Sequence, residues 1–64
     1  MKLTIYWLPA ALVGMERYNI CLRFSIPVHI TVNGETSCDI REEDLPLLRE
    51  YEKNGYLQIR YKNN

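Results

Sequence analysis

The chain has 64 residues, eight basic and eight acidic, and 47% of its residues are hydrophobic. A chain of this length forms one domain, residues 1–64, near the lower limit for a core that folds unaided. Its five tyrosines, one tryptophan and one phenylalanine add the aromatic area of a folding chain rather than a disordered one. The zero net charge argues against a dedicated nucleic-acid binder, because such proteins usually carry a basic excess.

The first predicted element is a strand over residues 2–8. Leu3, Ile5 and Trp7 alternate there with more polar neighbours, which is the period of a half-buried strand. Pro9 ends this strand, because a proline nitrogen cannot donate to a sheet ladder.

Residues 9–16 are predicted to form a loop whose middle, residues 10–13, is apolar. So apolar a loop seldom lies free in water. We expect it to fold back over the core. The alternative is that it contacts a partner.

A second strand is predicted over residues 17–26. Its apolar positions alternate with polar ones, and they are Ile20, Leu22, Phe24 and Ile26. Pro27 bends or ends this strand.

A hairpin is predicted over residues 28–40. Residues 28–32 alternate between β-branched and polar side chains, and Asn33 and Gly34 follow directly. Asn-Gly between extended runs is a strong hairpin signal, because both turn residues must accept positive φ. The returning arm, residues 35–40, is polar and typical of a sheet edge.

One helix is predicted over residues 44–54. Its apolar stripe consists of Leu45, Leu48 and Tyr51, with Leu47 beside it. Asp44 is the expected N-cap, which places Pro46 in the first turn, where its missing N–H costs nothing. Residues 40–43 then form a 3₁₀-like entry, and Gly55 supplies the left-handed stop. The alternative start, with Asp39 as the cap, would leave Pro46 breaking the helix.

After the helix, residues 56–61 alternate again and predict a closing strand. The resulting fold class is α+β: a small, mostly antiparallel sheet of four to five strands with a single helix packed on one face, in the order β-β-β-β-α-β.

The sheet face opposite the helix is the candidate binding surface. On the predicted register it displays tyrosine, arginine and amide side chains, and the proposed binding residues are Tyr6, Arg23, Tyr56, Gln58 and Arg60. Tyrosine and arginine are common anchors of protein contacts. We therefore expect a non-enzymatic interaction module that binds itself, as a homodimer, or a protein partner, through this open face or through an edge strand.

The alternative function is single-stranded nucleic-acid binding, with bases stacked on the tyrosines and phosphates held by the arginines. A bare solvated sheet face is a further possibility, since tyrosine and arginine tolerate exposure well. Nucleic acid ranks below a protein partner, because the chain has neither a basic excess nor a glycine-aromatic signature.

The reactive side chains do not predict an enzyme. His29 could meet Cys38 across the predicted hairpin, but one histidine and two cysteines are too few for a typical zinc site. The acidic residues 42–44 are typical of a helix entry and lack calcium-loop spacing. We expect no cofactor and no metal.

Cys21 and Cys38 could form a disulfide if the chain is exported. Free thiols in a reducing cytoplasm are the preferred interpretation. No apolar run in the sequence is long enough to span a bilayer, so no membrane association is expected.

Overall fold

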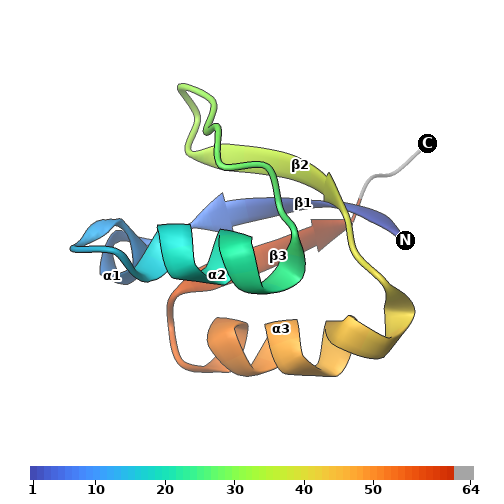
Figure 1. Cartoon of the computed structure of the whole chain (residues 1–64). Coiled ribbons are helices and arrows are strands. Elements are labelled where there is room, and N and C mark those ends of the chain that lie inside the picture. The colour runs from blue at the N-terminus through green and yellow to red at the C-terminus, as the bar shows by residue number, and fades with distance from the viewer. Residues whose placement is uncertain (62–64) are drawn as a thin grey trace.

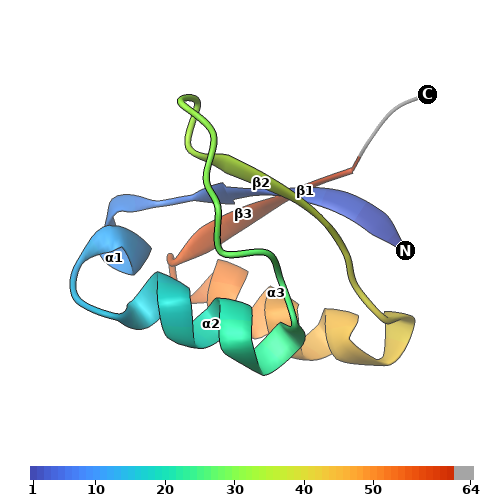
Figure 2. The ribbon, with the colours of Figure 1, turned by 45° about the horizontal axis from the view of Figure 1, so that its top comes forward.

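The computed structural model describes residues 1–61 as a three-stranded sheet covered on one face by helices (Figures 1 and 2). The elements in chain order are β1 (Lys2–Trp7), α1 (Pro9–Leu12), α2 (Glu16–Phe24), β2 (Glu35–Asp39), the 3₁₀ turn η1 (Glu42–Asp44), α3 (Leu45–Lys53) and β3 (Leu57–Tyr61). The sheet order is β2-β1-β3, and both strand pairs are antiparallel. The predicted α+β class is confirmed, but the prediction of four to five strands with a single helix is wrong, because the described residues form three strands and three α-helices.

The largest error concerns residues 17–26, which form α2 rather than a strand. Ile20, Cys21 and Phe24 are buried, a spacing that belongs to one helix face, whereas Leu22 is 61% exposed. Alternation along this segment therefore did not reflect burial. The helix ends at Ser25, whose φ of 56° is left-handed, and the Ile26 N–H donates to the Cys21 carbonyl at 2.8 Å.

The predicted hairpin over residues 28–40 is also wrong. A turn does form at Gly34, which has a φ of 78° and donates its N–H to the Thr31 carbonyl at 3.0 Å. The following strand β2 pairs with β1, not with residues 28–32, and Ile5 lies opposite Thr36 in its register. Because β1 comes first in the chain and lies between the other two strands, this pairing is a long-range choice that local turn chemistry does not reveal.

The apolar segment 9–16 is only partly folded back. Pro9 opens the short helix α1, and Ala11 of that helix is completely buried. Leu12 and Val13 instead remain exposed. One apolar side chain of this segment, Ala11, therefore packs in the core, and the next two, Leu12 and Val13, are exposed to solvent.

The first strand and the last two regular elements are confirmed. In β1, Leu3, Ile5 and Trp7 point into the core as their period predicts. Helix α3 begins after Asp44, behind the short turn η1, and Pro46 lies in its first turn. Asp44 flanks the helix but makes no side-chain capping bond.

The end of α3 explains how the chain turns directly into β3. Gly55 has a φ of 86°, the Tyr56 N–H donates to the Tyr51 carbonyl at 3.0 Å, and the Gly55 N–H donates to the Glu52 carbonyl at 3.1 Å. This bond pair is the Schellman motif, which is often accompanied by contact between the side chains that here are Tyr51 and Tyr56. Their rings meet edge-on with centroids 6.1 Å apart.

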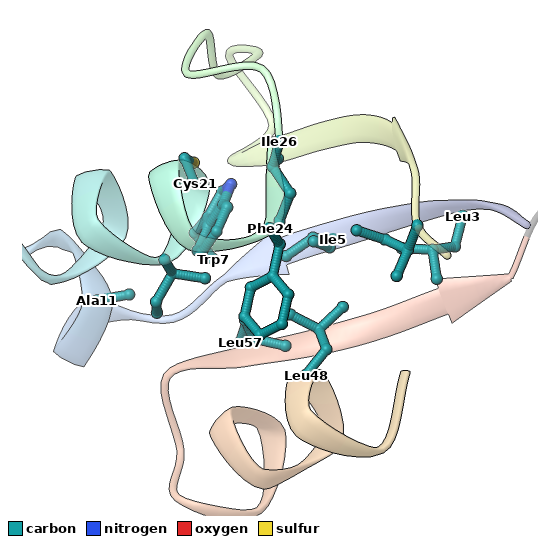
Figure 3. Packing of buried hydrophobic residues seen from close by; sticks show 11 residues of the cluster. Leu3, Ile5, Trp7, Ala11, Cys21, Phe24, Ile26, Leu48 and Leu57 are labelled. Atoms are coloured by element: carbon teal, nitrogen blue, oxygen red, sulfur yellow. The ribbon is translucent and has the colours of Figure 1, made fainter. Parts of the chain in front are cut away.

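The core lies between the sheet and the helices (Figure 3). Each strand and each α-helix places apolar side chains in this core or, for Cys38 of β2, against it. The buried apolar residues are Leu3, Ile5, Trp7, Ala11, Ile20, Cys21, Phe24, Ile26, Ile40, Leu48 and Leu57. Leu48 is the α3 residue that reaches furthest in, with 0% exposure.

Leu48→Asp should unfold the domain. An unpaired carboxylate in this core costs several kcal/mol, which is comparable with the whole stability of a small domain. Leu47→Asp is the matched control, because Leu47 is 45% exposed on the same helix. Thermal melting followed by circular dichroism should show a cooperative transition for the Leu47 variant and none for the Leu48 variant. Equal melting of the two would show that the helix face is assigned wrongly.

Candidate functional site

The sheet face that points away from the helices is polar. The strand registers place on it Lys2, Thr4 and Tyr6 from β1, Glu35, Ser37 and Asp39 from β2, and Gln58 and Arg60 from β3. Three of the five predicted binding residues, Tyr6, Gln58 and Arg60, therefore share this face. Tyr6 lies on the central strand β1, opposite Glu35 on one side and Gln58 on the other.

Two of the charged side chains of this face, Arg60 and Glu35, are already engaged with each other. The Arg60 guanidinium lies 4.5 Å from the centroid of the Tyr6 ring, and its Nη1 donates to Glu35 Oε2 at 2.9 Å. Such a half-exposed pair contributes only about 0.2–1 kcal/mol to stability. It nevertheless covers the aromatic ring on which a base would stack and neutralises the cation that a phosphate would need.

The other two predicted binding residues lie on the helix side of the molecule. Arg23 belongs to α2, donates from Nη1 to Tyr51 Oη at 2.9 Å, and stacks over the rings of Phe24 and Tyr51. Tyr56 is half-buried against Tyr51. Arg23 was misplaced because α2 was predicted as a strand. Tyr56 could have been placed correctly, since the residue after a helix-terminating glycine often packs back onto the last turn.

An exposed apolar stripe runs along α2 and was not predicted from the sequence. Met15, Tyr18 and Leu22 are exposed at spacings of three and four residues, so they lie on one side of the helix. The buried residues Ile20 and Phe24 lie on a different side. The three- and four-residue spacing was a readable signal, but only under a helical assignment of this segment.

The loop between α2 and β2 carries further exposed apolar side chains. Val28 and Ile30 are exposed, and Val32 is fully exposed at the tip. The loop is fastened to α2, because Arg17 Nη1 donates to the Val28 carbonyl at 2.5 Å and the Cys21 thiol contacts the Pro27 carbonyl at 3.8 Å.

Arg17 and Cys21 lie one helical turn apart, so the start of the loop, residues 27 and 28, lies against α2. We call the six exposed residues Met15, Tyr18, Leu22, Val28, Ile30 and Val32 the α2–loop apolar surface.

A buried polar chain holds the same loop against the sheet. The Trp7 indole Nε1–H donates to Thr36 Oγ1 at 2.8 Å, and the Thr36 hydroxyl donates to the His29 carbonyl at 2.8 Å. Thr36 is completely buried, and these two bonds use its hydroxyl both as acceptor and as donor. Loop residues 28 and 29 are thus held at two points, one on α2 and one on β2.

The thiols lie in an environment that suppresses their chemistry. Cys38 pairs with Leu3 in the sheet and is half-buried; burial, with the charges of Cys21 and Asp39, raises its pKa to about 11. Burial also raises the pKa of the Cys21 thiol, with Arg17 opposing the shift. Both cysteines are free.

His29 shares no hydrogen bond with Cys38 within residues 1–61, and its backbone carbonyl is bonded to Thr36 instead. The predicted proximity of His29 and Cys38 depended on the hairpin that does not form.

No protein-family model, curated protein or solved structure matches this chain. Among the described residues, no group of three histidine, cysteine, aspartate or glutamate side chains could hold a metal ion. In the same part of the chain, no helix is long and apolar enough to cross a membrane.

The thiols of the folded chain should be slow to alkylate. At pH 8 a thiol of pKa about 11 is thiolate roughly one hundredth as often as an ordinary thiol, so iodoacetamide should modify Cys38 about 100-fold more slowly than in the urea-unfolded chain. Mass spectrometry of time points measures both rates. Because the folded chain keeps this proton while the unfolded chain loses it near pH 9, stability should also fall as the pH rises between 9 and 11. Equal alkylation rates before and after unfolding would contradict the burial of Cys38.

Proposed function

We propose that this chain is a non-enzymatic interaction module that binds another protein chain through the α2–loop apolar surface. The observation that carries the proposal is the stripe of exposed apolar side chains on one side of α2, together with those on the loop that is bonded to this helix. Single exposed apolar residues are ordinary, whereas a group of them on a small domain is typical of an interaction site.

The composition of this surface supports the proposal further. Met15, Tyr18 and Leu22 combine an adaptable side chain, an aromatic anchor and an aliphatic side chain, and methionine and tyrosine are enriched at protein interfaces. A chain of 64 residues has a small core, so burying additional apolar area against a partner would also stabilise it.

The binding surface differs from the sheet face favoured in the sequence analysis. On that face Arg60, Tyr6 and Glu35 already satisfy one another, which leaves a partner little to gain. The same contacts give the nucleic-acid alternative less support than the apolar surface gives a protein partner. The raised pKa values of Cys21 and Cys38 support the non-enzymatic part of the proposal, because a thiol acts as a nucleophile only in its thiolate form. Free thiols also suit a reducing cytoplasmic location.

Site-specific photo-crosslinking in the cells that make the chain tests this proposal. A photoreactive residue at Tyr18, on the apolar surface, should give a discrete crosslinked product. The same probe at Lys53, exposed at the end of α3, should not. Adding Leu22→Lys to the chain with the Tyr18 probe should reduce the product about tenfold or more, because a charge then has to be desolvated at the contact.

Two outcomes would contradict the proposal. One is equal crosslinking at Tyr18 and Lys53. The other is a Tyr18 product whose yield does not change with Leu22→Lys.

A further inference from the structure

The side of α2 that faces away from the core has the residue spacing of a helix-pairing seam. Met15, Asn19 and Leu22 are exposed and follow one another at spacings of four and three residues, so they lie along one line of the helix. Tyr18 lies beside this line. Figure 2 shows α2 on the outside of the helical layer, with no other helix or strand in front of it. Alternating spacings of three and four residues are typical of the contact between two paired helices.

Two exposed charged side chains flank this line on the side away from Tyr18. Glu16 lies in the first turn of α2 and Arg23 in the last, and their separation of seven residues, about two turns, puts them on the same flank. Within residues 1–61 Glu16 makes no ion pair, and Arg23 donates to the neutral hydroxyl of Tyr51. The helix therefore presents an unpaired acid at one end and, on the same flank, a base without a carboxylate partner at the other.

We propose that α2 packs antiparallel against α2 of a second copy, about a two-fold axis at Asn19. This inference rests on the proposed function and names the occupant of the α2 part of the surface. In this arrangement Met15 of each copy lies near Leu22 of the other, and Glu16 of each copy lies beside Arg23 of the other. Because reversing the helix exchanges its ends, one sequence supplies both members of each pair. This is the self-complementarity that a two-fold interface requires.

The position of Asn19 at the axis fits the same arrangement. A carboxamide both donates and accepts, so two copies of Asn19 can hydrogen-bond to each other across the axis. Among the described residues, the side chain of Asn19 has no hydrogen-bond partner of its own. A single polar residue in an otherwise apolar seam fixes the register of two helices, because sliding one helix would bury the amide without its partner.

The charges select the antiparallel direction and a second copy as the occupant. A parallel pair would set the flank of Glu16 and Arg23 against the Tyr18 flank of the partner, and neither charge would meet its opposite. Arg23 is also held in position, since it stacks over the Phe24 and Tyr51 rings. Its guanidinium has further N–H donors beside the one bonded to Tyr51, so it can bind a carboxylate with little loss of side-chain freedom.

Charge reversal followed by sedimentation velocity tests the inference. The wild-type chain should shift from 7.6 kDa toward twice this mass as its concentration rises, as a weak dimer, because one short helix from each copy makes the contact. Glu16→Arg sets arginine beside arginine, and Arg23→Glu sets glutamate beside glutamate. Each variant should therefore weaken the dimer about tenfold or more.

Two combinations of these changes should recover the dimer. The double variant Glu16→Arg/Arg23→Glu exchanges the charges, so opposite charges again meet across the contact. An equimolar mixture of the two single variants also pairs opposite charges, because one chain then carries two bases on this flank and the other two acids. A general loss of folding or solubility would not be reversed in either case.

The controls separate pairing from folding and from net charge. Lys53→Glu makes the same change of charge as Arg23→Glu at the exposed end of α3, and it should leave the dimer unchanged. Each variant should keep the amide NMR spectrum of a folded chain. Arg23→Glu should alter it mainly around Tyr51, because the bond to that hydroxyl is lost.

A wild-type chain that stays at 7.6 kDa at every concentration would overturn the inference. So would a dimer that tolerates both single variants, or a double variant and a mixture no stronger than the single variants. A monomeric chain whose Tyr18 probe crosslinks to a different protein would overturn only this inference and leave the proposed function standing.

Discussion

The hydroxyl of Thr36 joins three parts of the chain that are far apart in sequence. It accepts the indole N–H of Trp7 at the end of the first strand and donates to the carbonyl of His29 in the loop before its own strand. Each of these groups would cost about 1–3 kcal/mol if left buried without a partner. Removing this hydroxyl would leave both bonds unmade, so the positions of Trp7, of β2 and of the loop depend on one another.

The consequences of this chain of bonds reach both the core and the surface. Trp7 is thereby fixed beneath the sheet, where Arg17 of α2 stacks over its ring at 5.9 Å and also holds the Val28 carbonyl. The loop is therefore attached to β2 and to α2 at adjacent residues. Its apolar side chains are exposed in a defined position, which is the property that an interaction surface needs.

The parts of the fold that could be predicted are those with local signals. The strand β1 has a clean period of two, and α3 has a proline at its start and a glycine after its end that set its limits. Residues 16–24 carry no such local signal. The spacing of Ile20 and Phe24 fits one face of a helix, and the alternation of Ile20, Leu22 and Phe24 fits a strand equally well. What decides between them is that β1 is already flanked by β2 and β3, and this is a long-range fact.

The candidate site also has features that could be predicted from the sequence and features that could not. Tyr6, Gln58 and Arg60 were placed on one face correctly, because strand period alone fixes it. Their mutual engagement could not be predicted, since the reach of Arg60 across Tyr6 to Glu35 depends on the register of two strand pairs. The stripe on α2 was hidden by the wrong element type. We therefore assign binding to the α2–loop apolar surface, whose apolar side chains are exposed to water, and not to the sheet face with its tyrosine and arginine side chains.

Amide hydrogen exchange at Thr31 in a Thr36→Val chain tests the central claim most directly. Valine keeps the shape of threonine and removes the hydroxyl, so the His29 carbonyl loses its bond and the loop loses its attachment to β2 at residue 29. We expect the Thr31 N–H, bonded to Glu35, to exchange faster by a larger factor than the Tyr56 N–H, bonded to Tyr51 at the end of α3. Equal acceleration of the two amides, or none, would show that Thr36 does not hold the loop, and the account would be wrong.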